Sequence, residues 1–219
     1  MTPAKQRAAR RSDALSKDLI VATAIEILDS EGEGALTFRA LARRLSTGSG
    51  ALYHHVANKD DVLRAATGQV IASTTHKSEH DAAPADAIRA LILGIFDAID
   101  AHPWVGAQLA REPWQVPLLD LFDAVAERLD ADGVAERTQF DAASVLVHYV
   151  LGVAAQYAAA ARALAGGADP SALLRAAVEQ RAGERSPVAA RLTEHDDREQ
   201  LRAGVDLVLA GIAALKGRP

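Results

Sequence analysis

The sequence predicts an all-α protein with a small N-terminal helical module followed by a larger helical domain. Apolar residues recur at intervals of three and four along most of the 219 residues, the spacing of one face of a helix. No segment shows the alternating pattern of a strand. The composition, 49% hydrophobic but only 4% aromatic with abundant Ala, suits close contacts between helices.

Residues 36–63 are the most informative segment, because they predict two short helices joined by a tight turn. Thr37 is a good N-cap for the first helix. Residues 46–48 end this helix, and we expect Gly48 or Gly50 to take the backbone angles that other residues avoid. The apolar stripe of the first helix is formed by Leu36, Leu41 and Leu45.

The second helix is expected at residues 49–55, with Leu52 and Val56 pointing inward because they lie four apart. Asn58 then caps a third helix, and Asp61 three residues later makes an approximate capping box. A second helix that is short and polar on its outer face is typical of a helix-turn-helix, in which that helix enters the DNA major groove. The outer face carries Ser49, Gly50, Tyr53 and His54.

Further helices follow throughout the chain. They are expected at residues 59–76, from Pro84 to the break at His102-Pro103, from there to about Leu109, and at 118–129, 140–164, 171–182 and 201–215. The clearest stripe is Ile88, Leu91, Ile92, Ile95, Phe96 and Ile99. The helix at 140–164 has Val147, Val150, Leu151, Ala154 and Ala158. The last helix has Leu201, Val205, Val208, Leu209, Ile212 and Leu215, with Gly204 and Gly211 on nearly the same face.

Charge is distributed unevenly. Residues 1–66 hold 10 Lys and Arg against 8 Asp and Glu, whereas residues 67–219 hold 14 against 21, so only the first part is net positive. Residues 1–16 read as a basic flexible arm that orders on phosphate, or equally as a solvated tail. The lack of cysteine excludes disulfides and thiolate metal sites. The chain has neither a long apolar run nor a signal-peptide core, which favours a cytoplasmic protein without a membrane span.

The motif around residues 52–63 resembles the TetR family of transcriptional regulators. The matching residues are Leu52-Tyr53-His54-His55-Val56, then Asn58-Lys59 and Val62-Leu63, preceded by the helix Ile20–Leu28 and by Leu36-Thr37. The resemblance covers residues 17–66 and implies a DNA-binding domain there, with a ligand-binding and dimerisation domain at residues 67–219. It implies a regulator, by family default a repressor, that a small molecule releases from DNA.

Individual residues carry over from the family. Arg39 matches a base-reading arginine, and an arginine can bind guanine through two hydrogen bonds. Ser49 and Gly50 match positions that reach base edges, and they carry less sequence information. The turn departs from the family by beginning Ser46-Thr47 instead of Gly and an apolar residue, and a turn rearranged by one residue would move Ser49 and Gly50 away from these positions. The positions that match phosphate or sugar contacts are Thr37, Tyr53, His54, His55 and Lys59.

The second half resembles the tetracycline-repressor branch of the family through residues 102–104, 147–152 and 207–212. This implies a homodimer in which two long helices of each chain form a four-helix bundle on a palindromic operator. The candidate ligand-binding residues are Trp104, Gln108, Trp114, Phe122, His148, Tyr149 and Gln156. Each of the aromatic residues could equally pack in the core instead of contacting a ligand. His148 lies on an apolar helix, which favours a hydrogen-bonded core histidine over a ligand-binding one. Gln108 stands where the repressor has a metal-binding His, so we expect neither a metal nor a cofactor, and a mainly apolar or aromatic effector.

Two other functions remain open. The chain could be a DNA-binding dimer without a ligand, using its second half only to dimerise. It could also be a helical enzyme, but the sequence lacks a Gly-rich phosphate loop, a nucleophile elbow and metal-ligand spacing. We therefore expect no catalytic activity.

Overall fold

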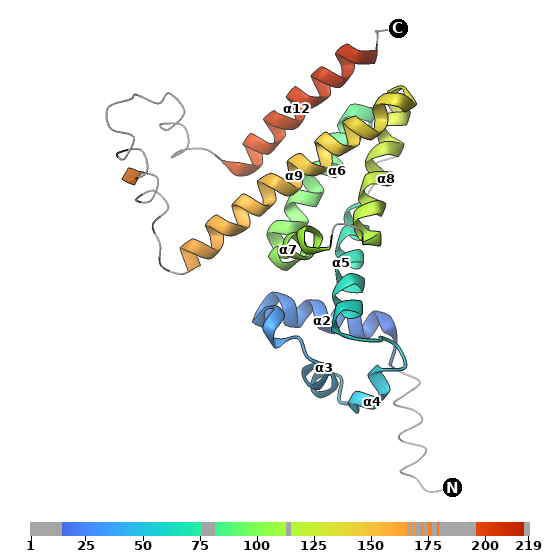
Figure 1. Ribbon diagram of the computed structural model, residues 1–219, viewed down its shortest axis with the longest axis vertical. Helices are drawn as coiled ribbons and strands as arrows, with labels where there is room; N and C mark the ends of the chain where they lie inside the picture. Colours follow the sequence, from blue (N-terminus) through green and yellow to red (C-terminus); the bar gives the residue numbers. More distant parts are fainter. Residues whose placement is uncertain are drawn as a thin grey trace, which may run out of the picture. The chain divides into compact units, whose positions relative to one another are not determined.

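The computed structural model describes residues 15–75, 82–112, 115–165 and 196–216, with isolated positions between residues 167 and 179. Every regular element in these ranges is a helix (Figure 1), so the predicted all-α fold is confirmed. The chain forms two compact units. Unit 1 comprises Met1–His76 and His102–Asp120, and unit 2 comprises Lys77–Ala101 and Leu121–Pro219. Most of the helix expected at 171–182 and most of the arm 1–16 lie outside the described residues.

Unit 1 contains the predicted three-helix module and one helix from later in the chain. Its elements are α2 (Lys17–Glu31), η1 (Glu33–Ala35), α3 (Phe38–Arg44), α4 (Ser49–Leu52), α5 (Lys59–Thr75) and α7 (Pro103–Arg111). The predicted caps are present, since Thr37 Oγ1 accepts from the N–H of Ala40 at 3.1 Å and Asn58 Oδ1 accepts from that of Asp61 at 2.8 Å. The return bond of the capping box goes from Ala57 N–H to Asp61 Oδ2 at 3.1 Å. These local bonds fix where each helix starts.

The core of unit 1 joins α2, α3, α4 and α5. Leu52 and Val56 are buried in it as predicted, with 0% and 2% of their surfaces exposed. Trp104 of α7 packs against the same core. Helix α5 also packs along α7, so α7 belongs to the N-terminal module in space although 26 residues lie between Thr75 and His102. The sequence pattern alone would place it with the second domain.

Unit 2 is built on α6 (Pro84–Ala101), α9 (Glu136–Ala165) and α12 (Asp197–Lys216), which pack on one another (Figure 1). Helix α8 (Val116–Ala131) begins in unit 1 and continues into unit 2. All six predicted stripe residues of α6 are buried. Ion pairs add to this apolar contact, since Arg198 bonds both carboxylate oxygens of Asp97 at 2.7 and 2.9 Å, and Arg89 bonds Asp206 at 2.7 Å. The three helices therefore have an apolar interior and charged margins.

Details of α9 and α12 differ from the sequence predictions. Both begin four residues early, at Glu136 and Asp197. Leu215 is 45% exposed instead of buried. The two glycines also differ: a Cβ at Gly204 would overlap the Tyr149 ring of α9, whereas one at Gly211 would meet nothing within 4 Å. Only Gly204 serves a close helix contact inside this unit.

By length and composition alone, one stretch of the described chain, Glu136–Ala159 of α9, could cross a membrane, and there would be a second if the bent pair Pro84–Ala101 and Pro103–Arg111 were one span. A core helix of a soluble protein can meet the same criteria, and α9 packs one of its faces against α6 and α12 while residues such as Val145 stay exposed.

Candidate nucleic-acid interface and buried polar residues

The start of α3 presents two of the predicted DNA-contacting residues to solvent. Thr37 and Arg39 are both exposed. The Thr37 oxygen accepts the capping bond, which leaves its O–H able to donate to another acceptor. Phe38 stacks on Tyr53 with ring centroids 4.5 Å apart, and this contact joins α3 to the end of α4. Tyr53 remains 60% exposed despite this contact.

The turn between α3 and α4 is made differently from our expectation. Gly48 has φ −86° and Gly50 lies within α4, so neither glycine takes the left-handed conformation. Ser46 takes it instead, with φ 51°. The expectation was wrong because it relied on residue type, whereas the bond from Thr47 N–H to the Ala42 oxygen at 2.9 Å closes the helix over Ser46. Helix α4 then starts at Ser49, and both Ser49 and Gly50 are exposed.

Helix α4 is shorter than the predicted 49–55. It ends at Leu52, and a turn follows in which the His55 N–H bonds the Leu52 oxygen at 2.9 Å. His54 is exposed and His55 is half-buried. The stretch from Glu33 to Asp60 contains no acidic residue between its ends. Over that span it carries Arg39, Arg43, Arg44, His54, His55 and Lys59. Arg44 is paired with Glu26 and Glu31, so exposed cations such as Arg39 and Arg43 are the ones most able to attract phosphate.

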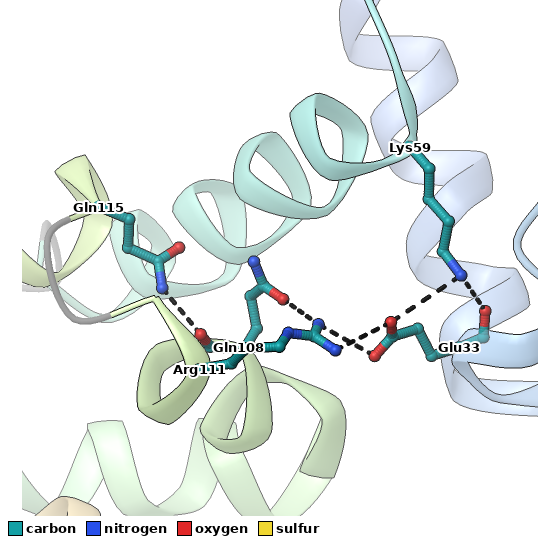
Figure 2. A network of polar contacts seen from close by, with 5 residues as sticks. All are labelled: Glu33, Lys59, Gln108, Arg111 and Gln115. Atoms are coloured by element: carbon teal, nitrogen blue, oxygen red, sulfur yellow. Dashed lines mark hydrogen bonds and ion pairs between the residues drawn. The ribbon is translucent and has the colours of Figure 1, made fainter.

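Lys59 is the predicted phosphate-binding residue whose surroundings are most informative. Its Nζ donates to the backbone oxygen of Glu33 at 2.8 Å and lies 3.8 Å from the Glu33 carboxylate. Arg111 of α7 binds the same carboxylate with two parallel hydrogen bonds of 3.1 Å (Figure 2). The bonded Glu33 carboxylate raises the pKa of Arg111 above its usual value, partly offset by desolvation. One carboxylate thus serves two cations from α5 and α7.

Arg111 also connects this ion pair to a buried amide. Its Nη2 donates to Gln108 Oε1, and Gln108 is only 1% exposed. Gln115 lies against the same residue, because its Nε2 donates to the Gln108 backbone oxygen at 3.0 Å. Figure 2 shows both amides on the side of α7 that faces α5.

Within the described part of the chain, three buried side-chain atoms have no hydrogen-bond partner: Thr67 Oγ1, Gln108 Nε2 and Gln115 Oε1. They belong to α5, α7 and the residue before α8, three segments of unit 1. Next to Thr67, a Cβ at Gly68 would lie 3.4 Å from Pro117, so α5 passes close to the start of α8. A buried polar atom without a partner lowers the stability of the fold by about 1–3 kcal/mol, so the presence of each of these three atoms needs an explanation.

The other predicted ligand-binding residues are dispersed. Trp104 is half-buried, and its Nε1 donates to Asp29 at 2.7 Å. Trp114 lies outside the described residues. In unit 2, Phe122 is half-buried and makes an edge contact with His148, with centroids 5.9 Å apart. The remaining two, Tyr149 and Gln156, are half-buried and exposed respectively.

His148 is exposed, so the expectation of a core histidine was wrong. Its neighbours Leu146, Val147 and Val150 are fully buried, and this helical phase turns residue 148 outward. Sequence reasoning also missed Glu33, Thr67, Arg111 and Gln115, which come from segments far apart along the chain. Among the described residues, no group of three or more His, Asp or Glu side chains is arranged to hold a metal ion.

Comparisons with known proteins decide the family. The family model for bacterial regulatory proteins of the tetR family matches residues 20–66. The structure of the transcriptional regulator SCO7222, a TetR from Streptomyces coelicolor, is 41% identical, with a TM-score of 0.79 over 92% of this chain and 99% of that one. The chain belongs to the TetR family. The resemblance seen in residues 17–66 is therefore confirmed, and the module around α3 and α4 is the helix-turn-helix of a TetR transcriptional regulator.

Two further relatives are informative. An HTH-type transcriptional regulator from Saccharopolyspora erythraea is 32% identical over 151 residues, which are 68% of this chain and 63% of the relative, so the chain spans less than two thirds of it. Mycobacterium smegmatis BioQ is 27% identical, with a TM-score of 0.69 over 91% of this chain and 98% of BioQ. BioQ has also been solved with its natural double-stranded DNA operator, at a TM-score of 0.61, 26% identity, and coverage of 91% of this chain and 99% of that one.

Proposed function

We propose that this TetR-family protein is a homodimeric repressor that binds a palindromic DNA operator and is released by a small molecule. The observation that carries the DNA-binding part is the exposed face of α3 and α4, on which Arg39 and Tyr53 stand in a stretch without acidic residues. The operator complex of the related BioQ supports it. Its relatives are transcriptional regulators, so we propose no catalytic activity and a cytoplasmic site of action.

Base reading would depend mainly on Arg39, because Ser49 offers a single hydroxyl and Gly50 has no side chain. A bidentate arginine–guanine contact contributes about 1–3 kcal/mol of discrimination. Thr37, Tyr53, His54, His55 and Lys59 would contact phosphate or sugar and fix the position of the module. Two modules related by a twofold axis would bind half-sites about 34–36 Å apart.

The dimer surface would lie on unit 2. Leu207 of α12 is 76% exposed, and Val145 of α9 is 51% exposed. Small exposed residues extend the apolar face of each helix. They are Ala203, Ala210, Gly211 and Ala214 on α12, and Gly152, Ala155 and Ala159 on α9. An apolar stripe of this length on two long helices is unfavourable in water and suits a second copy. His148 and Gln156 lie on the exposed side of α9, so we assign them to this surface and not to the ligand.

The effector site is proposed at Thr67, Gln108 and Gln115. Their unpaired atoms are a hydroxyl, an amide donor and an amide acceptor, and none of the three side chains is charged. A neutral molecule with hydrogen-bond donors and acceptors on an apolar or aromatic body would bind there. Trp104 would contribute to the fold, because its indole is already bonded to Asp29.

Operator binding is tested first. An operator is selected from random-sequence duplexes with the purified protein, and its affinity is measured by fluorescence anisotropy. Arg39→Ala should weaken binding by roughly 10–100-fold and relax one base position per half-site. The matched control is Arg202→Ala, which removes the same charge from an exposed position of α12 and should change affinity little. Equal affinities for Arg39→Ala and wild type would contradict the proposed interface.

Dimerisation is tested at Gly211, where a new side chain meets nothing inside the protomer. Gly211→Glu should place a charge in the dimer contact and give a monomer in sedimentation, with operator binding lost. Arg202→Gln makes the same change in net charge on the opposite side of α12 and should remain dimeric. A dimeric Gly211→Glu protein would place the contact elsewhere.

A further inference from the structure

We infer that Arg111 and Glu33 are positioning residues that control how available Lys59 is to DNA, and that Gln108 links them to the effector site. The inference rests on the proposed function and adds a route of regulation to it. Every residue involved belongs to unit 1, on η1, α5 and α7.

The first step concerns the Glu33 carboxylate. Arg111 occupies both of its oxygens at 3.1 Å, whereas Lys59 Nζ is 3.8 Å from the carboxylate and is held mainly by the Glu33 backbone oxygen. With Arg111 in place the carboxylate is neutralised, and Lys59 can turn to a phosphate at little cost. Without Arg111, the Glu33 carboxylate would keep its negative charge and hold Lys59 more strongly. It would also repel the phosphates of the approaching DNA.

The second step concerns the Gln108 amide. Its oxygen accepts from Arg111, while its nitrogen is buried without a partner (Figure 2). A molecule that donates to this amide competes with Arg111 for the oxygen or makes the amide turn. Once turned, the amide presents N–H groups to a guanidinium that has only donors, so the contact becomes repulsive. Arg111 would then move away from Glu33.

The consequence is a loss of one phosphate contact per protomer. An effector that donates to Gln108 would thus weaken DNA binding by leaving Glu33 unneutralised beside Lys59. A molecule that only accepts from Gln108 Nε2 would keep the amide as it is and would leave DNA binding intact. The inference therefore predicts that a molecule that donates a hydrogen bond to Gln108 weakens DNA binding, whereas one that only accepts from it does not.

The test uses the full chain and the selected operator, without any effector. Arg111→Gln should lower affinity about three- to tenfold in the dimer, as expected for partly exposed ion pairs counted twice. It should also reduce the slope of log K against log salt by about 2, because each lost phosphate contact removes about 0.9. The double variant Glu33→Gln/Arg111→Gln should recover both affinity and slope, which a merely structural role of Arg111 would not allow.

The matched control is Glu112→Gln. Glu112 follows α7 and is 3.5 Å from Arg64 of α5, so the change removes an equal charge from an ion pair that does not include Lys59. It should not restore the slope of Arg111→Gln. Gln108→Leu should shift the slope in the same direction as Arg111→Gln, and Glu33→Gln should suppress that shift. Circular dichroism would verify that each variant is folded.

Three results would overturn the inference. They are an unchanged slope in Arg111→Gln, a double variant no better than Arg111→Gln, or equal recovery with Glu112→Gln. In each case DNA binding itself would persist, so the proposed function would stand. If the wild-type protein selects no duplex at all, the proposed function fails, and the inference fails with it.

Discussion

The interiors of the two units differ in chemistry. Between α6, α9 and α12 of unit 2, the buried side chains are aliphatic or aromatic, among them Ile92, Ile95 and Val150 at 0% exposure. In unit 1, the described chain buries Thr23, Thr67, Gln108 and Gln115. A buried polar atom without a partner destabilises the fold by about 1–3 kcal/mol, so the interior of unit 1 is not optimised for stability alone. The effector site that we propose in unit 1 would account for this difference.

The close helix contact of unit 2 should be sensitive to substitution. Gly204→Ala should lower the free energy of unfolding by about 1–2 kcal/mol, because the overlap of the new Cβ with the Tyr149 ring outweighs the roughly 1 kcal/mol by which Ala is favoured over Gly in a helix. Urea denaturation measures it. The double variant Gly204→Ala/Tyr149→Phe should recover part of the loss, since the hydroxyl is the nearest atom to the new methyl group. A neutral Gly204→Ala would show that α12 and α9 are not closely packed at this point.

A polar atom placed in the apolar interior should also be costly. Val150→Thr keeps the shape of the side chain and adds a hydroxyl at a fully buried position of α9. We expect the free energy of unfolding to fall by about 1–3 kcal/mol. Thermal and urea unfolding of the purified variant provide the measurement. An unchanged stability would mean that unit 2 tolerates buried polar atoms as readily as unit 1. The two interiors would then not differ in this respect.

The opposite substitution in unit 1 should have the opposite sign. Thr67→Val removes a buried hydroxyl without a partner, and should raise the free energy of unfolding by about 1–2 kcal/mol. Thr23→Val is the matched control, because the Thr23 hydroxyl donates to the Leu19 oxygen at 2.8 Å. That variant should be neutral or slightly destabilised. Destabilised Thr67→Val protein would indicate that its hydroxyl is satisfied in solution.

The smallest effect is expected at the turn of unit 1. Ser46 holds a left-handed backbone conformation with φ 51°, which is unfavourable for a residue with a side chain. Ser46→Gly should raise the free energy of unfolding by up to about 1 kcal/mol, the gain being reduced by the greater freedom of glycine in the unfolded chain. Differential scanning calorimetry can detect the corresponding rise in Tm. Ser46→Ala should give no gain, and a Tm increase there would refute the explanation from backbone strain.

The sequence alone determined the local features of this protein. Caps at Thr37 and Asn58, the buried pair Leu52 and Val56, and the six-residue stripe of α6 depend on neighbours within a few positions, so their spacing predicted them. The same is true of the family, because residues 20–66 carry the matching motif in one continuous stretch. Spacing did not predict the conformation of the turn, because the left-handed position could fall on Ser46 or on one of the glycines.

Tertiary structure decided which distant residues meet. Glu33, Lys59 and Arg111 come from three elements, and their contact depends on α7 packing against α5. Packing likewise decided that His148 is exposed and that Gly204, but not Gly211 on nearly the same face, lies against Tyr149. A sequence pattern states which side of a helix is apolar, but not which neighbour covers it. Hydrogen bonds and ion pairs between distant segments form only after that packing is chosen, so their partners cannot be inferred from spacing.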